Sequence, residues 1–171
     1  ANAVVILGSR TITPQQADAR TILIAFTVRS YLRSQPVVAD RIKPVYVAAE
    51  ILESENVAHA RTAGADEVIE STRVGFSMLA HAVVVHGTAA IMGQLAVLEA
   101  HNLYVGQFPE FLEAGSFAEV ARALKGATGA MLIGVRKAEL EQYRLNPPDE
   151  MQVTKEYQLI YLAERAVLEP I

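Results

Sequence analysis

The sequence has 171 residues, of which 51% are hydrophobic and 20% are charged, and this balance excludes an intrinsically disordered chain. The formal net charge of -4 gives the chain no electrostatic reason to bind nucleic acid or an anionic membrane surface. Cysteine is absent, which excludes disulfides and thiolate metal sites and is compatible with a reducing, cytoplasmic location.

The first predicted element is a strand at residues 3–7. Its sequence, AVVIL, is a short apolar run closed by Gly8, which is typical of a strand covered on both faces in a parallel sheet. Thr13 and Pro14 then predict a helix start, because a hydroxyl caps the first turn and proline lacks only an N–H that this turn leaves unbonded. The helix is expected to end at SQP, residues 34–36.

A second strand is predicted at residues 44–50, followed by a short helix that Ser54 caps and that ends near Ala63. Gly64 stands where the helix end needs a positive φ, and the strand EVIE follows at residues 67–70. Two consecutive strand-helix-strand units of this length predict a parallel sheet with right-handed crossovers.

The turn after the first strand decides which part of a Rossmann-like sheet this is. A dinucleotide fingerprint needs G-x-G-x-x-G, but here only Gly8 is present, so residues 3–7 do not fit a first strand. They fit a fourth strand, whose usual neighbour is the first strand. The prediction is an α/β fold with the C-terminal half of a Rossmann-like parallel sheet and an edge strand that something must cover.

The next segment, residues 73–101, is apolar on all sides, and Ser71 or Thr72 is expected to cap it. A helix that is apolar all round must be buried on all sides. We predict a helix pair, broken near Gly87 and packed between its own domain and a partner subunit. The candidate interface residues are Val74, Phe76, Met78, Leu79, Val83, Ile91 and Met92.

A transmembrane helix over residues 78–98 is the alternative, since the length would suffice. His81, His86, Thr88 and Gln94 interrupt this stretch, however, and no cluster of lysine or arginine flanks it. The interface hypothesis is therefore preferred.

A smaller α+β unit is predicted after residue 102, which divides the chain into domains 1–102 and 103–171. Its expected elements are a strand at 103–109, a helix capped by Ser116, and strands at 129–137, 141–145 and 157–164.

Carboxylates gather just past the second strand, at the edge where open α/β sheets place their ligands. Glu50, Glu53 and Glu55 could hold a hard cation such as calcium. The alternative for Glu53 and Glu55 is that acids favour the positive end of the following helix, which leaves Glu50 as the better metal candidate. The four histidines lack metal-ligand spacing, and no Ser/His/Asp grouping can be nominated, so the sequence does not predict an enzyme.

The stretch PVYVAAEILESENVAHARTAGADEVIESTRVGFSMLAHAV resembles the C-terminal half of the RCK (regulator of conductance of potassium) domain of potassium channels and transporters. The matching features are Ala49-Glu50, Glu55-Asn56, Gly64-Ala65-Asp66, Val68-Ile69, Gly75 and Leu79-Ala80. Residues 103–165, with MLIGVRK and LNPPDE, resemble the small C-terminal lobe of that family. They depart from it at Thr154-Lys155-Glu156, where family members often have a Gly-Asp turn.

The resemblance implies a cytoplasmic gating module that senses a ligand, assembles as a homo-dimer or larger ring, and acts on a pore domain that tethers it to the membrane in the full-length protein. It implies ligand-binding positions at Gly8, Ser9, Glu50 and Glu53, with calcium at Glu50 or a nucleotide if the Gly-rich half is also present. Gly8 and Ser9 lack the carboxylate that calcium-binding relatives carry there. The alternative functions are a nucleotide-linked subunit of a potassium uptake transporter and a truncated Rossmann dehydrogenase.

Overall fold

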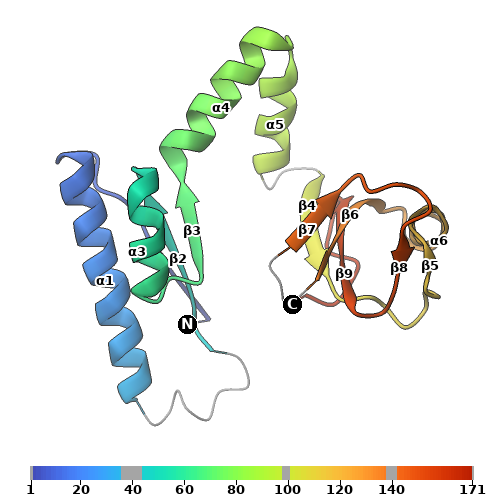
Figure 1. The fold of residues 1–171 in the computed structure, drawn as a ribbon, viewed down its shortest axis with the longest axis horizontal. Coiled ribbons are helices and arrows are strands. Elements are labelled where there is room, and N and C mark those ends of the chain that lie inside the picture. The colour runs from blue at the N-terminus through green and yellow to red at the C-terminus, as the bar shows by residue number, and fades with distance from the viewer. Residues whose placement is uncertain (1, 36–43, 98–100, 138–141, 171) are drawn as a thin grey trace. The chain divides into compact units, whose positions relative to one another are not determined.

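A computed structural model describes residues 2–35, 44–97, 101–137 and 142–170 (Figure 1). The chain divides into two compact units, Ala1–His86 and Gly87–Ile171, and each is described by itself. Residues 36, 98–100 and 141, which belong to predicted elements, lie outside the described residues.

The first unit alternates strands and helices, as predicted. Its elements are β1 (Ala3–Ile6), α1 (Pro14–Ser34), β2 (Tyr46–Ile51), η1 (Ser54–Asn56), α3 (Val57–Thr62), β3 (Glu67–Glu70) and α4 (Ser71–Val84). Thr13 caps α1 by accepting a hydrogen bond from the Gln16 N–H, with Pro14 in the first turn. Gly64 follows α3 with φ 104°, and the Gly64 and Ala65 N–H groups donate to Arg61 and Ala60 carbonyls, which closes the helix in a Schellman motif.

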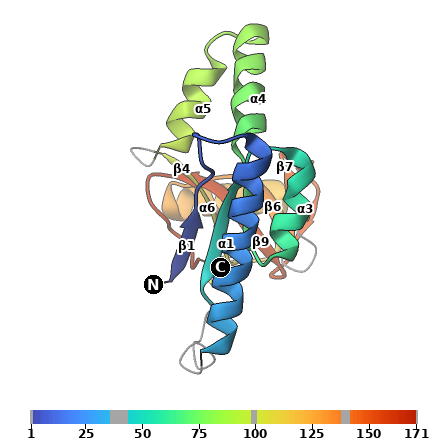
Figure 2. The same cartoon turned by 90° about the vertical axis from the view of Figure 1, so that its left-hand side faces the viewer.

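The three strands form a parallel sheet in the order β1-β2-β3. The helices α1 and α3 lie side by side on one face of it (Figure 2). Beneath them is a core made of Ile6, Ala25, Val47, Ala49 and Ala65. The α/β class and the parallel sheet with its crossover helices are thereby confirmed.

The other face of this sheet carries exposed apolar residues. Along it lie Val5, which is 66% exposed, Leu7 at 75% and Ile69 at 50%. The prediction that the first strand is covered on both faces is therefore wrong for the described chain, where only Ile6 of β1 is buried. The prediction that this strand forms an edge holds, because β1 pairs with β2 alone among the described strands.

Two predicted helix caps are also wrong. The Ser54 hydroxyl donates to Glu70 Oε2 at 2.6 Å instead of capping a helix. Glu70 and not Ser71 or Thr72 precedes the first residue of α4, and it makes no side-chain cap bond. A polar side chain contacts the serine hydroxyl in each place, Glu70 at Ser54 and Arg10 at Ser71.

The second unit contains α5 (Thr88–Ala96) and the predicted α+β lobe. The elements of the lobe are β4 (Asn102–Gly106), β5 (Gly115–Ser116), α6 (Phe117–Thr128), β6 (Met131–Lys137), β7 (Gln142–Leu145), β8 (Gln152–Val153) and β9 (Tyr157–Ala163). Ser116 and Glu119 form a capping box at the start of α6, as the sequence indicated for Ser116. The strands form an antiparallel sheet in the order β4-β9-β6-β7, and β5 pairs with β8. Leu124, Val120, Leu159 and Tyr161 lie in the core beneath α6.

Candidate functional site

The carboxyl edge of the parallel sheet brings Gly8 and Glu50 together. The Gly8 N–H donates to Glu50 Oε2 at 2.9 Å, and the Arg10 guanidinium pairs with Oε1 of the same carboxylate. Arg10 also reaches Ser71 Oγ at 3.5 Å. The Glu50 side chain is only 13% exposed, whereas Arg10 is 62% exposed. Glu50 therefore joins the loop after β1 to the end of β2, and a cation bound there would have to displace Arg10.

The surroundings of Glu50 lower its pKa. The largest cause is the Ser71 hydroxyl, followed among the favourable causes by the Gly8 N–H and the positive charge of Arg10, while partial burial acts in the opposite direction. A carboxyl group whose pKa is lower in the folded chain stabilises the fold above its unfolded pKa. That stability is lost as the pH falls through the folded pKa.

We therefore expect Glu50→Gln to weaken the dependence of stability on acid. Wild-type stability should fall as the pH drops below about 4.5, the ordinary value for this carboxyl, and the variant should lose less over the same range. Urea unfolding at about pH 7 and about pH 3.5 measures this difference. Glu119→Gln is the comparison, because the pKa of Glu119 is also lowered, by its bonds to Ser116. If wild type and Glu50→Gln lost the same unfolding free energy between the two pH values, the role given to Glu50 in acid stability would be contradicted.

The other predicted ligand positions, Ser9 and Glu53, are held in different contacts. Ser9 Oγ lies 3.1 Å from Thr11 Oγ1, and the Glu53 N–H donates to Asp18 Oδ2 at 3.0 Å. Asp18, which is completely buried, also accepts from the Leu52 N–H. The structure thus adds Arg10 and Asp18 to the edge, neither of which was predicted. Across the part of the chain that the structure describes, no three His, Asp or Glu side chains gather in a way that could hold a metal.

The helices α4 and α5 present an unusually apolar surface. Neither contains a buried residue, so the predicted burial on all sides is not provided by the described chain itself. The break near Gly87 is confirmed, with φ 90° at that residue. Among the predicted interface residues, Met78 is half-buried and the others are exposed, namely Val74 51%, Phe76 68%, Leu79 64%, Val83 78%, Ile91 59% and Met92 37%.

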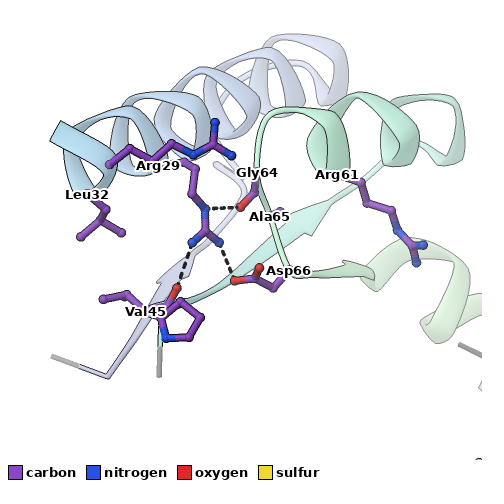
Figure 3. A pocket seen from close by; sticks show the side chains of 9 residues that line it. Arg29, Leu32, Val45, Arg61, Gly64, Ala65 and Asp66 are labelled. Carbon is purple, nitrogen blue, oxygen red and sulfur yellow. Dashed lines mark hydrogen bonds and ion pairs between the residues drawn. The ribbon is translucent and has the colours of Figure 1, made fainter. Parts of the chain in front are cut away.

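The opposite, amino edge of the sheet has a cavity of about 470 Å³ (Figure 3). It is lined by Arg29, Leu32, Arg33, Pro44, Val45, Arg61, Gly64, Ala65 and Asp66. Figure 3 shows Arg29 pointing from α1 toward Gly64, Val45 and Asp66, whereas Arg61 points away from this group. The guanidinium donates to the Gly64 carbonyl at 2.9 Å, to the Val45 carbonyl at 3.1 Å and to Asp66 Oδ2 at 2.5 Å. These bonds make Arg29 a structural clamp between α1 and the sheet.

Removal of this clamp is expected to destabilise the first unit. Arg29→Ala should lower its free energy of unfolding by about 2 kcal/mol, because charge-assisted bonds to two carbonyls and a carboxylate are lost together. Arg33→Ala is the matched control, since Arg33 is exposed on the same helix and should change stability by less than about 0.5 kcal/mol. Urea unfolding followed by circular dichroism measures both. Equal effects of the two variants would show that the clamp does not stabilise the fold.

No protein-family model matches the sequence. No curated protein matches it either. Among solved structures, the human SLO3 gating ring is similar with a TM-score of 0.69 and 17% identity, over 96% of this chain and 33% of that chain. The GsuK channel bound to NAD has a TM-score of 0.39 at 18% identity, over 95% of this chain and 25% of that one. The GsuK RCK domain has a TM-score of 0.38 at 18% identity, over 95% and 30%.

The fold is inferred from the similarity to the SLO3 gating ring. This chain spans about a third of the length of that chain. Within the described ranges, none of the helices combines the length and the apolarity that a membrane crossing requires. The parallel sheet with its crossover helices and the small α+β lobe occur in the order expected from the resemblance. The chain therefore has an RCK-like fold, as the sequence predicted.

Proposed function

We propose that the chain is a ligand-sensing regulatory module of a potassium channel, which assembles with copies of itself through α4 and α5. The observation that carries this proposal is the exposure of apolar residues along both helices in a chain whose fold is similar to a gating ring. The expected partner beyond the second copy is the pore domain.

The length and the complete lack of burial of α4 support self-association. It is a helix of 14 residues with none buried, and a helix of this length is marginal in water unless an apolar face packs against something. Phe76, Leu79 and Val83 follow one another at spacings of three and four residues, so they form one stripe along the helix. A two-fold related copy of α4 would bury that stripe with the same residues on both sides.

The proposed mechanism combines a ligand edge with an interface between two subunits. A ligand that binds one relative orientation of two subunits more tightly shifts the population toward it. The resulting rotation about the α4 and α5 interface would act on the pore. Coupling of about 1–3 kcal/mol per site is usual, so several subunits have to act together. The proposed ligand positions are Gly8, Ser9, Glu50 and Glu53. The proposed boundary between the sheet domain with its interface helices and the regulatory lobe lies after residue 102.

Cysteine cross-linking tests the proposed interface, because the sequence contains no cysteine of its own. We expect a single cysteine at Val83 to form covalent dimers under mild oxidation at micromolar protein. A single cysteine at Arg122, exposed on α6, is the control for random collision. Equal rates of cross-linking at the two positions would contradict the interface.

The channel assignment needs a separate measurement, since a dimer alone does not identify a channel. Potassium flux into vesicles that hold the natural polypeptide containing this sequence should change with Leu79→Glu. Flux that does not depend on this substitution would argue against a gating function, even if the interface exists.

A further inference from the structure

The carboxyl edge of the parallel sheet carries a positive charge of its own. Arg10, on the loop between β1 and α1, pairs with Glu50 near the end of β2. The same guanidinium nitrogen reaches Ser71 Oγ, at the first residue of α4, at 3.5 Å. One side chain therefore connects the loop after β1 with both β2 and α4, and all three residues lie within the described ranges of the first unit.

Both oxygens of the Glu50 carboxylate already accept hydrogen bonds. Oε2 accepts from the Gly8 N–H at 2.9 Å, and Oε1 accepts from Arg10. The approach to Oε2 is also narrow, since a Cβ placed on Gly8 would lie 3.3 Å from this oxygen and 3.6 Å from the Leu52 side chain. A calcium ion needs about six to eight oxygen ligands at about 2.3–2.6 Å, and it would meet an N–H and a guanidinium here.

The charge of Glu50 requires a partner, because its side chain is mostly buried. Its lowered pKa keeps the carboxylate ionised at neutral pH. A guanidinium is always charged at this pH, so Arg10 supplies the partner whatever the metal concentration. Arg10 itself is exposed, and solvent screening leaves such a pair with little effect on stability. The consequence of the pair therefore lies in which cation occupies the edge.

We infer that Arg10 is a built-in cation of this edge, which occupies the position beside Glu50 that a divalent metal would need and makes the edge insensitive to calcium. This differs from what the family resemblance implies for Glu50. The contacts themselves do not depend on any function. What they say about sensing rests on the proposed function, and it narrows the class of ligand at this edge to molecules other than a divalent metal ion.

The test is a calcium titration of the whole chain, followed by NMR at constant ionic strength and neutral pH. The titration runs to about 10 mM, which is tenfold above the roughly 1 mM of weak calcium sites in proteins. In the wild type, we expect no saturable shift of the Gly8 and Glu50 amides. In Arg10→Ala, which frees the carboxylate, the same amides should shift and approach saturation in the millimolar range. Arg10→Lys keeps a cation and should remain insensitive.

Arg73→Ala is the matched control at the same edge. Arg73 is an exposed arginine that pairs with Glu70 at the start of α4, so its removal frees another carboxylate but leaves Arg10 in place. Calcium should therefore still cause no saturable shift of Gly8 and Glu50 in this variant. Unchanged amide positions in the second unit show that each variant is folded.

Three results would overturn the inference. Saturable calcium shifts at Gly8 and Glu50 in the wild type would show that Arg10 does not exclude the metal. The absence of such shifts in Arg10→Ala would show that some other feature excludes it. Equal shifts in Arg73→Ala and Arg10→Ala would show that the loss of any arginine charge is sufficient. Because the readout is metal binding, and not potassium flux or self-association, failure here is distinguishable from failure of the proposed function.

Discussion

Asp18→Ala is expected to lower the free energy of unfolding by about 3 kcal/mol, because it leaves several buried donors without an acceptor. The Asp18 carboxylate is completely buried on α1. It accepts from the Leu52 N–H at 2.8 Å, the Glu53 N–H at 3.0 Å and Asn56 Nδ2 at 2.9 Å. This one side chain therefore anchors the segment between β2 and α3, which follows the candidate ligand edge.

Urea unfolding of three variants tests this anchor. Asp18→Asn keeps one acceptor oxygen but turns an amide donor toward other donors, so an intermediate loss is expected. Glu55→Ala is the control, because Glu55 is an exposed acid in the same segment and should change stability by less than about 0.5 kcal/mol. A loss below about 1 kcal/mol for Asp18→Ala would mean that the segment is held by other contacts.

The second large effect concerns the apolar stripe on α4. Leu79→Glu is expected to weaken self-association by about 30-fold or more, which corresponds to the roughly 2 kcal/mol typical of a central interface residue. A charge at this position would have to be buried without a partner. Sedimentation equilibrium over a range of concentrations measures the change in dissociation constant.

Ser77→Glu is the control on the same helix. Ser77 lies two residues before Leu79, and residues two apart do not share a side of a helix. It introduces the same charge on α4 outside the stripe of Phe76, Leu79 and Val83, so it should weaken association much less. An equal loss in both variants would show that charge on the helix, and not burial of the stripe, governs association.

The strand and helix order was predictable because chemical signals mark most boundaries. Thr13 with Pro14, Gly64 and Ser116 each satisfy a backbone requirement that few other residues meet, and all three occur at the predicted helix ends. Coverage of the first strand was not predictable, because an apolar run is the same whether its covering element belongs to this chain or to another. The burial of Ile6 and the exposure of Val5 come only from the structure.

The candidate site was predictable in part. Gly8 and Glu50 were both named as ligand positions through the family resemblance, and the Gly8 N–H donates to Glu50 because parallel strands end at one edge. Arg10 was missed because a long side chain on a loop gives no periodic signal. Asp18 did have a signal, since it shares a helix face with Thr21 and Ala25, and a charged residue on a buried face needs partners.

The central claim is that this chain assembles through α4 and α5, and its solution mass tests it most directly. We would measure light scattering of the 171-residue chain over a concentration series from low to high micromolar. The account predicts a mass of at least twice 18.5 kDa that approaches 18.5 kDa only on dilution or in Leu79→Glu. A mass of 18.5 kDa at every concentration would contradict it, because the apolar helices would then have no second copy to bury them.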